Sequence, residues 1–154
     1  MKTILHIFII FTALNASAAV APHSEESMTE GSTHVIRGKV LALSFKTQRK
    51  KNGTLFARDR IFKVTMSVIK VEKGKTIKTG DELIFEAWQP SMRLPLLPGP
   101  QGHHPIPAKG DQIKVYLLYN AKSKTYHPYM PNGIQIIGKE KSKKLSKQSS
   151  TENE

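Results

Sequence analysis

The chain of 154 residues contains no cysteine. This absence excludes a disulfide framework, thiolate metal sites and a lipid anchor attached to a cysteine behind a signal peptide. A small domain without disulfides must be stabilised by its hydrophobic core alone, so most of its ordered length has to contribute to that core. Extracellular eukaryotic domains of this size often carry disulfides, and their absence therefore favours a bacterial exported protein.

Long apolar runs are also missing, with one exception near the N-terminus. After Lys2, residues 4–14 are almost entirely apolar, and the small residues of Ala16-Ser17-Ala18 follow. This order is typical of a secretory signal peptide cleaved after Ala18. The run is too short for a membrane-spanning helix, which needs about 20 apolar residues. We expect a secreted or periplasmic protein with no transmembrane segment in its mature form.

Acidic residues are scarce. Twelve Asp and Glu stand against 24 Lys and Arg, a formal net charge of +12. A field of this sign favours anionic partners such as acidic polysaccharide, anionic lipid or nucleic acid. Because the protein is expected to be exported, nucleic acid is disfavoured as a partner. The expected partner is an anionic envelope component or a protein. Lys-rich surfaces also keep β-proteins soluble and protect edge strands, so composition alone does not decide between a binding surface and a solvated one.

Composition divides the chain into four parts. Residues 1–18 are the expected signal peptide, and the polar residues 19–33 are typical of a flexible leader. Residues 139–154, rich in Lys and Ser, have no apolar periodicity and are expected to form a disordered tail. The remaining residues, 34–138, suffice for one domain.

Within 34–138 the dominant pattern is the alternation typical of strands. Phe62, Val64, Met66 and Val68 alternate with polar residues, and the phase then changes at Ile69. Such a change within one strand predicts a β-bulge or strong coiling of the strand. Thr79-Gly80-Asp81 and Lys109-Gly110-Asp111 precede two of the other strands in the same manner, and we expect Asp81 and Asp111, like Asp59, to cap turns or strand starts. The other expected strands are 35–45, 82–88, 112–120 and 134–137, with a basic connector and a turn at Lys51-Asn52-Gly53-Thr54 between the first two.

These features predict an all-β fold, a small closed barrel of five or six strands with a long Pro-rich connector between strands three and four. Val35-Ile36-Arg37-Gly38-Lys39-Val40, the long second strand and the two Gly-Asp turns together resemble uncharacterised exported bacterial domains with an OB-like layout. That layout is similar to the inhibitory domain of the tissue inhibitors of metalloproteinases and to netrin-like modules. Those inhibitors place an N-terminal cysteine on the protease zinc, so their activity does not transfer to this chain.

The connector at residues 89–108 is the main candidate for function, because loops this long in compact domains are often functional or disordered. Its prolines favour extended conformations, which lowers the entropy lost on docking to a partner. Trp and Arg are enriched at binding hot spots. The alternative is that the same side chains cover the open end of the barrel. The candidate binding residues are Trp88, Arg93, Leu96, Leu97, His103 and His104.

No motif for catalysis, cofactor binding or metal binding is apparent. The adjacent His103 and His104 point in opposite directions in an extended chain and do not readily share one metal. The serines lack the context of a nucleophile elbow. Four tyrosines near lysines, at 116, 119, 126 and 129, match the aromatic and basic platform with which OB-folds stack nucleic acid, but tyrosine is also common in strands. We therefore expect a non-catalytic binding or structural module, with an unfamiliar hydrolase or metal-binding protein as the alternative.

Overall fold

The computed structural model describes residues 21–52, 55–94 and 101–139, and in them it is all-β apart from one short helix. The signal peptide, the Gly53-Thr54 part of the expected turn, Leu96 and Leu97, and residues 140–154 of the expected tail lie outside these ranges. The elements are α1 (Glu25–Gly31), β1 (His34–Asn52), β2 (Leu55–Lys73), β3 (Glu82–Leu94), β4 (Gln112–Asn120), β5 (Thr125–Pro128) and β6 (Ile134–Gly138).

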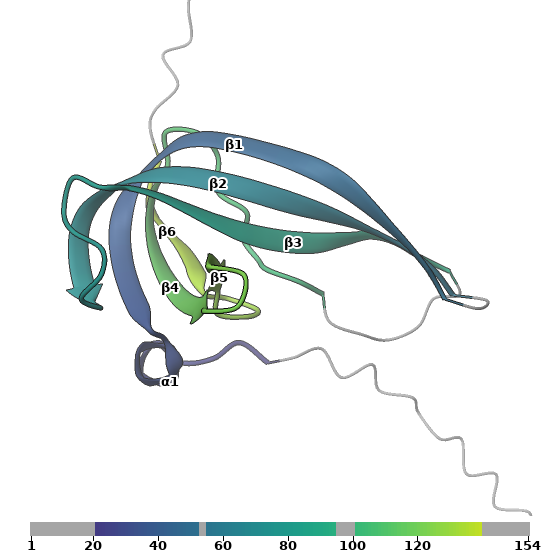
Figure 1. Cartoon of the computed structure of the whole chain (residues 1–154), viewed down its shortest axis with the longest axis horizontal. Helices are drawn as coiled ribbons and strands as arrows, with labels where there is room; N and C mark the ends of the chain where they lie inside the picture. The colour runs from purple at the N-terminus through teal and green to yellow at the C-terminus, as the bar shows by residue number, and fades with distance from the viewer. Residues whose placement is uncertain (1–20, 53–54, 95–100, 140–154) are drawn as a thin grey trace, which may run out of the picture.

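The strands form one mixed sheet in the order β1-β2-β3-β5-β4-β6, in which β1 also pairs with β4 (Figure 1). Most neighbours are antiparallel, whereas β3 and β5 are parallel and meet at one residue pair, Phe85 and Tyr126. β1 is paired on both edges only over residues 35–39, with β2 on one side and β4 on the other. The hydrophobic core lies between these strands and includes Val64, Met66 and Ile113.

The bulge predicted at the phase change in the second strand is confirmed. Arg37 pairs with Lys70 and the next residue, Gly38, pairs with Val68, so Ile69 has no partner in β1. Gly38 is required at this position, because a Cβ there would lie 2.2 Å from the backbone oxygen of Ser67. The extra residue and the close backbone approach let β1 and β2 bend together.

The two Gly-Asp turns are built alike. The carboxylate of Asp81 accepts the N–H of Lys78, and that of Asp111 accepts the N–H of Ala108, both at 2.8 Å. The preceding glycines have φ of 93° and 92°, a region that glycine adopts without strain. Each turn then exchanges two backbone hydrogen bonds with an earlier strand, the first with Val68 and the second with Val40. The expected capping role is therefore confirmed for these two aspartates.

Three expectations need correction. The third strand does not end at Trp88 but continues to Leu94, so the first part of the expected loop 89–108 is strand. The basic connector between the first two strands is strand too, paired as far as Asn52 and Leu55. Asp59 is not at a turn or strand start but inside β2, where it is buried. These segments are held largely by pairing with neighbouring strands, and their charged residues and Pro90 weaken the hydrophobic alternation that indicates a strand.

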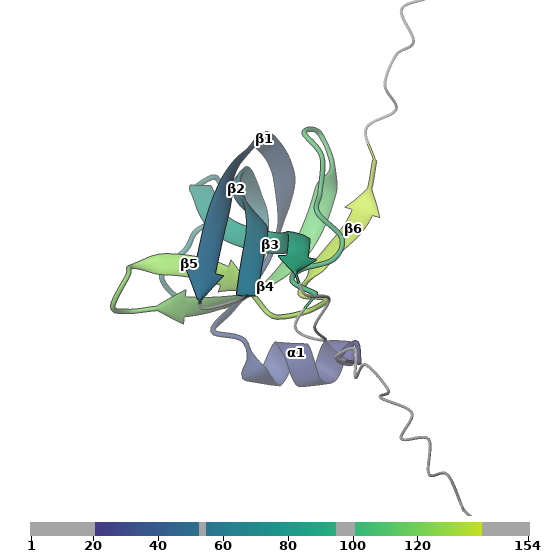
Figure 2. The same ribbon diagram turned by 90° about the vertical axis from the view of Figure 1, so that its right-hand side faces the viewer.

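The segment 19–33, expected to be a flexible leader, contains α1. Ser24 caps the helix by accepting the N–H of Ser27. The helix lies beyond one end of the strands (Figure 2), where Met28 is fully buried against Val35 and Tyr116. Met28 is the one buried apolar residue of this helix, and a single residue is too weak a periodic signal to be recognised in the sequence.

We expect Met28→Ala to lower the free energy of unfolding by about 2–5 kcal/mol, because it removes a buried side chain and leaves a cavity. Urea unfolding followed by circular dichroism measures this. Glu26→Ala, an exposed change on the same helix, is the control and should stay within about 0.5 kcal/mol of wild type. Equal stability of the two variants would show that α1 does not contribute to the folded core.

Candidate functional site

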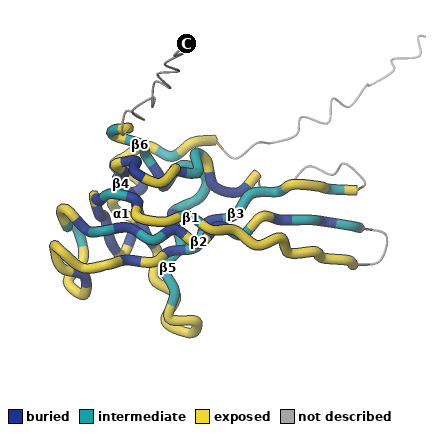
Figure 3. Tube along the Cα trace, turned by 90° about the horizontal axis from the view of Figure 1, so that it is seen from above, coloured by how far each residue is buried: buried dark blue, intermediate teal, exposed yellow. Residues whose placement is uncertain are grey.

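The most distinctive surface of the molecule is a three-stranded extension, here called the arm. It consists of residues 44–52 of β1, 55–63 of β2 and 86–94 of β3. In Figure 3 it extends away from the part of the molecule that contains α1, β4 and β6, and its β1 strand is exposed. β2 is the central strand of the arm and is paired on both sides.

The arm carries a large share of the positive charge. It contains eight basic and two acidic side chains, whereas the whole chain has a formal net charge of +12. Half of that excess therefore lies on the arm. The basic residues are Lys46, Arg49, Lys50, Lys51, Arg58, Arg60, Lys63 and Arg93, and the acidic ones are Asp59 and Glu86.

The pairing register assigns these charges to two faces of the arm. Residues directly opposite each other in paired strands share a face. The Phe45 face, as we call it, has four basic residues and no acidic one, because both carboxylates belong to the opposite face. Its members are Phe45, Thr47, Arg49 and Lys51 of β1, Phe56, Arg58, Arg60 and Phe62 of β2, and Ala87, Gln89, Met92 and Leu94 of β3.

Two contacts define the chemistry of the Phe45 face. Phe45 is 61% exposed, rests against Phe62 and has the guanidinium of Arg60 5.9 Å from its ring centre. Arg49 lies directly opposite Arg58, an arrangement of like charges that destabilises a sheet. Within the described residues, Nε of Arg58 is buried without a hydrogen-bond acceptor. An exposed aromatic ring beside uncompensated guanidinium groups is suited to an anionic ligand.

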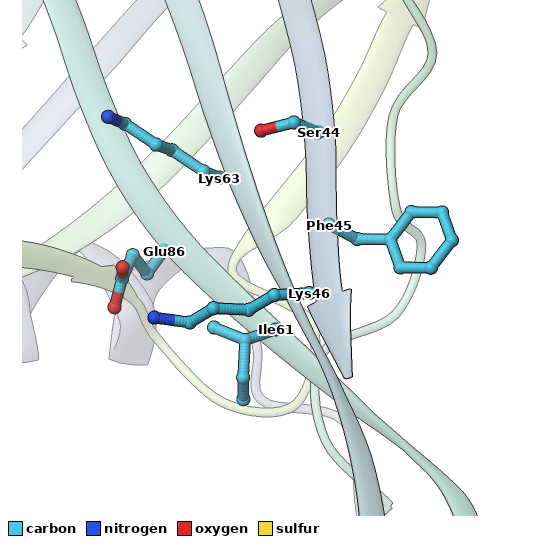
Figure 4. Close-up of a pocket in the computed structure, with 6 residues that line it drawn as sticks. All are labelled: Ser44, Phe45, Lys46, Ile61, Lys63 and Glu86. Carbon is cyan, nitrogen blue, oxygen red and sulfur yellow. The ribbon is translucent and has the colours of Figure 1, made fainter. Parts of the chain in front are cut away.

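The opposite face of the arm has a shallow depression of about 160 Å³, lined by residues of β1, β2 and β3. Figure 4 shows Lys46, Lys63 and Glu86 on this face, with Phe45 pointing away from them. Lys63 and Glu86 are directly opposite each other in the register, so opposite charges partly compensate here. This face is therefore the less suitable one for an anion.

Arg93, a predicted binding residue, has structural partners. Its guanidinium contacts the buried carboxylate of Asp59 at 2.6 Å and donates to the backbone oxygen of Arg58 at 3.3 Å. The more distant ammonium of Lys50 lies 3.7 Å from the same carboxylate. Arg93 thus neutralises Asp59 and holds the end of β3 against β2. Binding of a partner by Arg93 stays a prediction.

We expect Arg93→Leu to destabilise the protein by about 1–3 kcal/mol, because it leaves the buried Asp59 without its closest donor. Chemical unfolding measures the effect. The double variant Asp59→Asn with Arg93→Leu should regain part of the loss, since the uncompensated charge is then gone. No recovery in the double variant would contradict a structural role for this ion pair.

His103 and Trp88 form a second internal contact. Nδ1 of His103 accepts the backbone N–H of Trp88 at 3.0 Å, so the neutral ring carries its hydrogen on Nε2, which donates to the carbonyl of Pro128 at 3.0 Å. The rings of Trp88 and His103 meet edge to face. Gly102, the residue before His103, approaches the carbonyl of Trp88 so closely that no Cβ fits. The buried His103 thus attaches the connector to β3, whereas His104 is exposed.

Burial lowers the pKa of His103, and burial also lowers that of His34. In the unfolded chain a histidine has a pKa of about 6.5. Below that pH the unfolded state binds more protons than the folded state, so the free energy of unfolding falls as the pH falls. We expect His103→Gln to reduce the difference in unfolding free energy between about pH 7 and about pH 5, measured by urea titration. His104→Gln should keep the wild-type pH dependence, and identical slopes in all three proteins would contradict the assignment.

The other candidates from the sequence do not come together as one site. Of the four tyrosines, Tyr116 is fully buried and Tyr129 packs beside it under α1, and only Tyr119 and Tyr126 adjoin each other, with ring centres 5.0 Å apart. In the described residues no group of three or more His, Asp or Glu side chains is placed to hold a metal ion. Over the same residues no helix has the length and apolar character needed to cross a bilayer.

No family model and no curated protein matches this chain. The arm itself is a feature that sequence reasoning missed. The signal that could have revealed it is the alternation of Phe56, Arg58, Arg60 and Phe62, which continues the period of the second strand towards the N-terminus.

Proposed function

We propose that this protein is an exported, non-catalytic binding module with an OB-like barrel as its body, and that the Phe45 face of the arm binds an extended anionic partner in the cell envelope. One observation carries the proposal: the Phe45 face has four basic side chains, no acidic one, and a directly opposed pair of arginines. Such an arrangement costs stability in the free protein, and a bound anion would offset that cost.

Strand order supports the barrel. β1 pairs with both β2 and β4. β3, the neighbour of β2, makes a parallel contact with β5, and β5 is the neighbour of β4. This succession, with β5 between β3 and β4, supports a small Greek-key barrel as the body of the protein. In such a body the arm extends the hairpin of the first two strands beyond the barrel. An extension of this kind can contact a partner that is larger than a small molecule.

Protection of the sheet edge does not account for these charges. Lysines on edge strands discourage aggregation, and that explanation fits Lys46 and Lys51 on β1. Arg58 and Arg60 belong to β2, which is paired on both sides, so they have no edge to protect. Basic residues two positions apart on a strand are separated by about 6.8 Å. This spacing suits a chain of repeated negative charges better than a single small anion.

We expect the triple variant Arg49→Glu, Lys51→Glu and Arg60→Glu to bind inorganic polyphosphate and polygalacturonate at least tenfold more weakly than wild type at low ionic strength, since it reverses the field of the Phe45 face. Isothermal titration calorimetry measures the affinity. Wild-type affinity should also fall as salt is added, because exposed charges are screened.

A matched control makes the same change in charge elsewhere. Lys75, Lys109 and Lys122 are exposed and lie outside the arm, so their replacement by Glu should weaken binding much less. If both triple variants lose affinity equally, net charge and not the arm is responsible. If wild type binds neither polymer at low ionic strength, the proposed function is wrong.

A further inference from the structure

The outer edge of β1 is open along the arm. β4 covers this edge only from His34 to Lys39, and Val40 exchanges the last two backbone bonds with the turn at Gly110 and Asp111. From residue 42 to residue 52 β1 pairs with β2 on its inner side, and no described strand pairs with the outer side of residues 41–52. This length exceeds that of a typical strand of about 5–6 residues. The edge therefore presents backbone N–H and C=O groups to which another strand can add.

The charge of this edge selects the strand that can occupy it. Residues 41–52 contain four basic side chains and no acidic one. A second copy of the chain pairing here would bring like charges against each other, which is unfavourable in a sheet. An acidic strand is favoured by the same charges, and it also offers the backbone groups that a polysaccharide lacks. The four basic side chains are Lys46, Arg49, Lys50 and Lys51.

We propose that an extended acidic protein segment adds to β1 along residues 41–52 as an additional strand of the sheet. This inference rests on the proposed function and names the class of its partner. Side chains of the added strand would alternate between the two faces of the arm. On one face they lie beside Phe45 and Arg49, and on the other beside Lys46 and Lys50. The segment accordingly has acidic residues on both faces, with an apolar residue beside the exposed ring of Phe45.

The test uses a synthetic peptide of about eight residues, long enough for a strand, that has Glu at both odd and even positions and Val at a single position, so that acidic side chains lie on both faces of the added strand. Two further peptides have the same sequence and charge, but in each of them a different alternate set of backbone amides is methylated. Methylation removes the donors on one edge of the added strand. At least one methylated peptide is expected to bind the full-length mature protein at least about tenfold more weakly, because several backbone hydrogen bonds are lost. Hydrogen exchange of amides in residues 41–52 should slow with the unmodified peptide.

The outcomes separate this inference from the proposed function. If polyphosphate binds to the arm but both methylated peptides bind as well as the parent, or the peptide does not bind at all, strand addition is wrong and anion binding by the arm stands. If the parent peptide binds without slowing exchange in residues 41–52, strand addition is wrong as well. If no anionic probe binds, both proposals fail.

Discussion

The bend of β1 and β2 around Gly38 is the constraint on which the rest of the structure depends. β1 must pair with β2 on one edge and β4 on the other over its first residues, and it can do so only if the long hairpin curves. Ile69, unmatched in the register, and the absence of a side chain at Gly38 permit this curvature. The curve brings Val40 to the second Gly-Asp turn, which starts β4 in the position where its apolar residues enter the core.

The same hairpin therefore has two roles along its length. Near Gly38 its inward side chains, such as Val64 and Met66, are buried by neighbouring strands. β4 pairs with the hairpin only as far as Lys39, and beyond Phe62 most side chains on the corresponding face of the hairpin are basic or exposed. A sheet face that no neighbouring strand buries is either polar or a binding surface. The opposed arginines and the exposed Phe45 favour a binding surface. The ion pair between Asp59 and Arg93 keeps the end of β3 attached to this extension.

Strand alternation made much of the body predictable. The alternation of the second strand indicated both the strand and its bulge, and each Gly-Asp turn is capped by a carboxylate three residues from the N–H group that it accepts. β5 was missed because four residues held mainly by β4 have no periodicity of their own. Hot-spot composition suggested a binding role for Arg93, but its nearest partner, Asp59, comes from another strand. His103, another binding candidate of the connector, is held by the backbone of Trp88 and of Pro128. A residue type reports what a side chain can do and not which neighbour it meets.

By itself the sequence determined the all-β class, the positions of the turns and the excess of positive charge, because each follows from local periodicity, backbone conformation or composition. Only the tertiary structure decided which basic residues share a face and that none of the described strands pairs with the outer edge of β1 from residue 41. Both properties depend on strand register and on where a neighbouring strand ends. Register places every second side chain on one face, so it converts charges dispersed along the chain into one continuous basic surface.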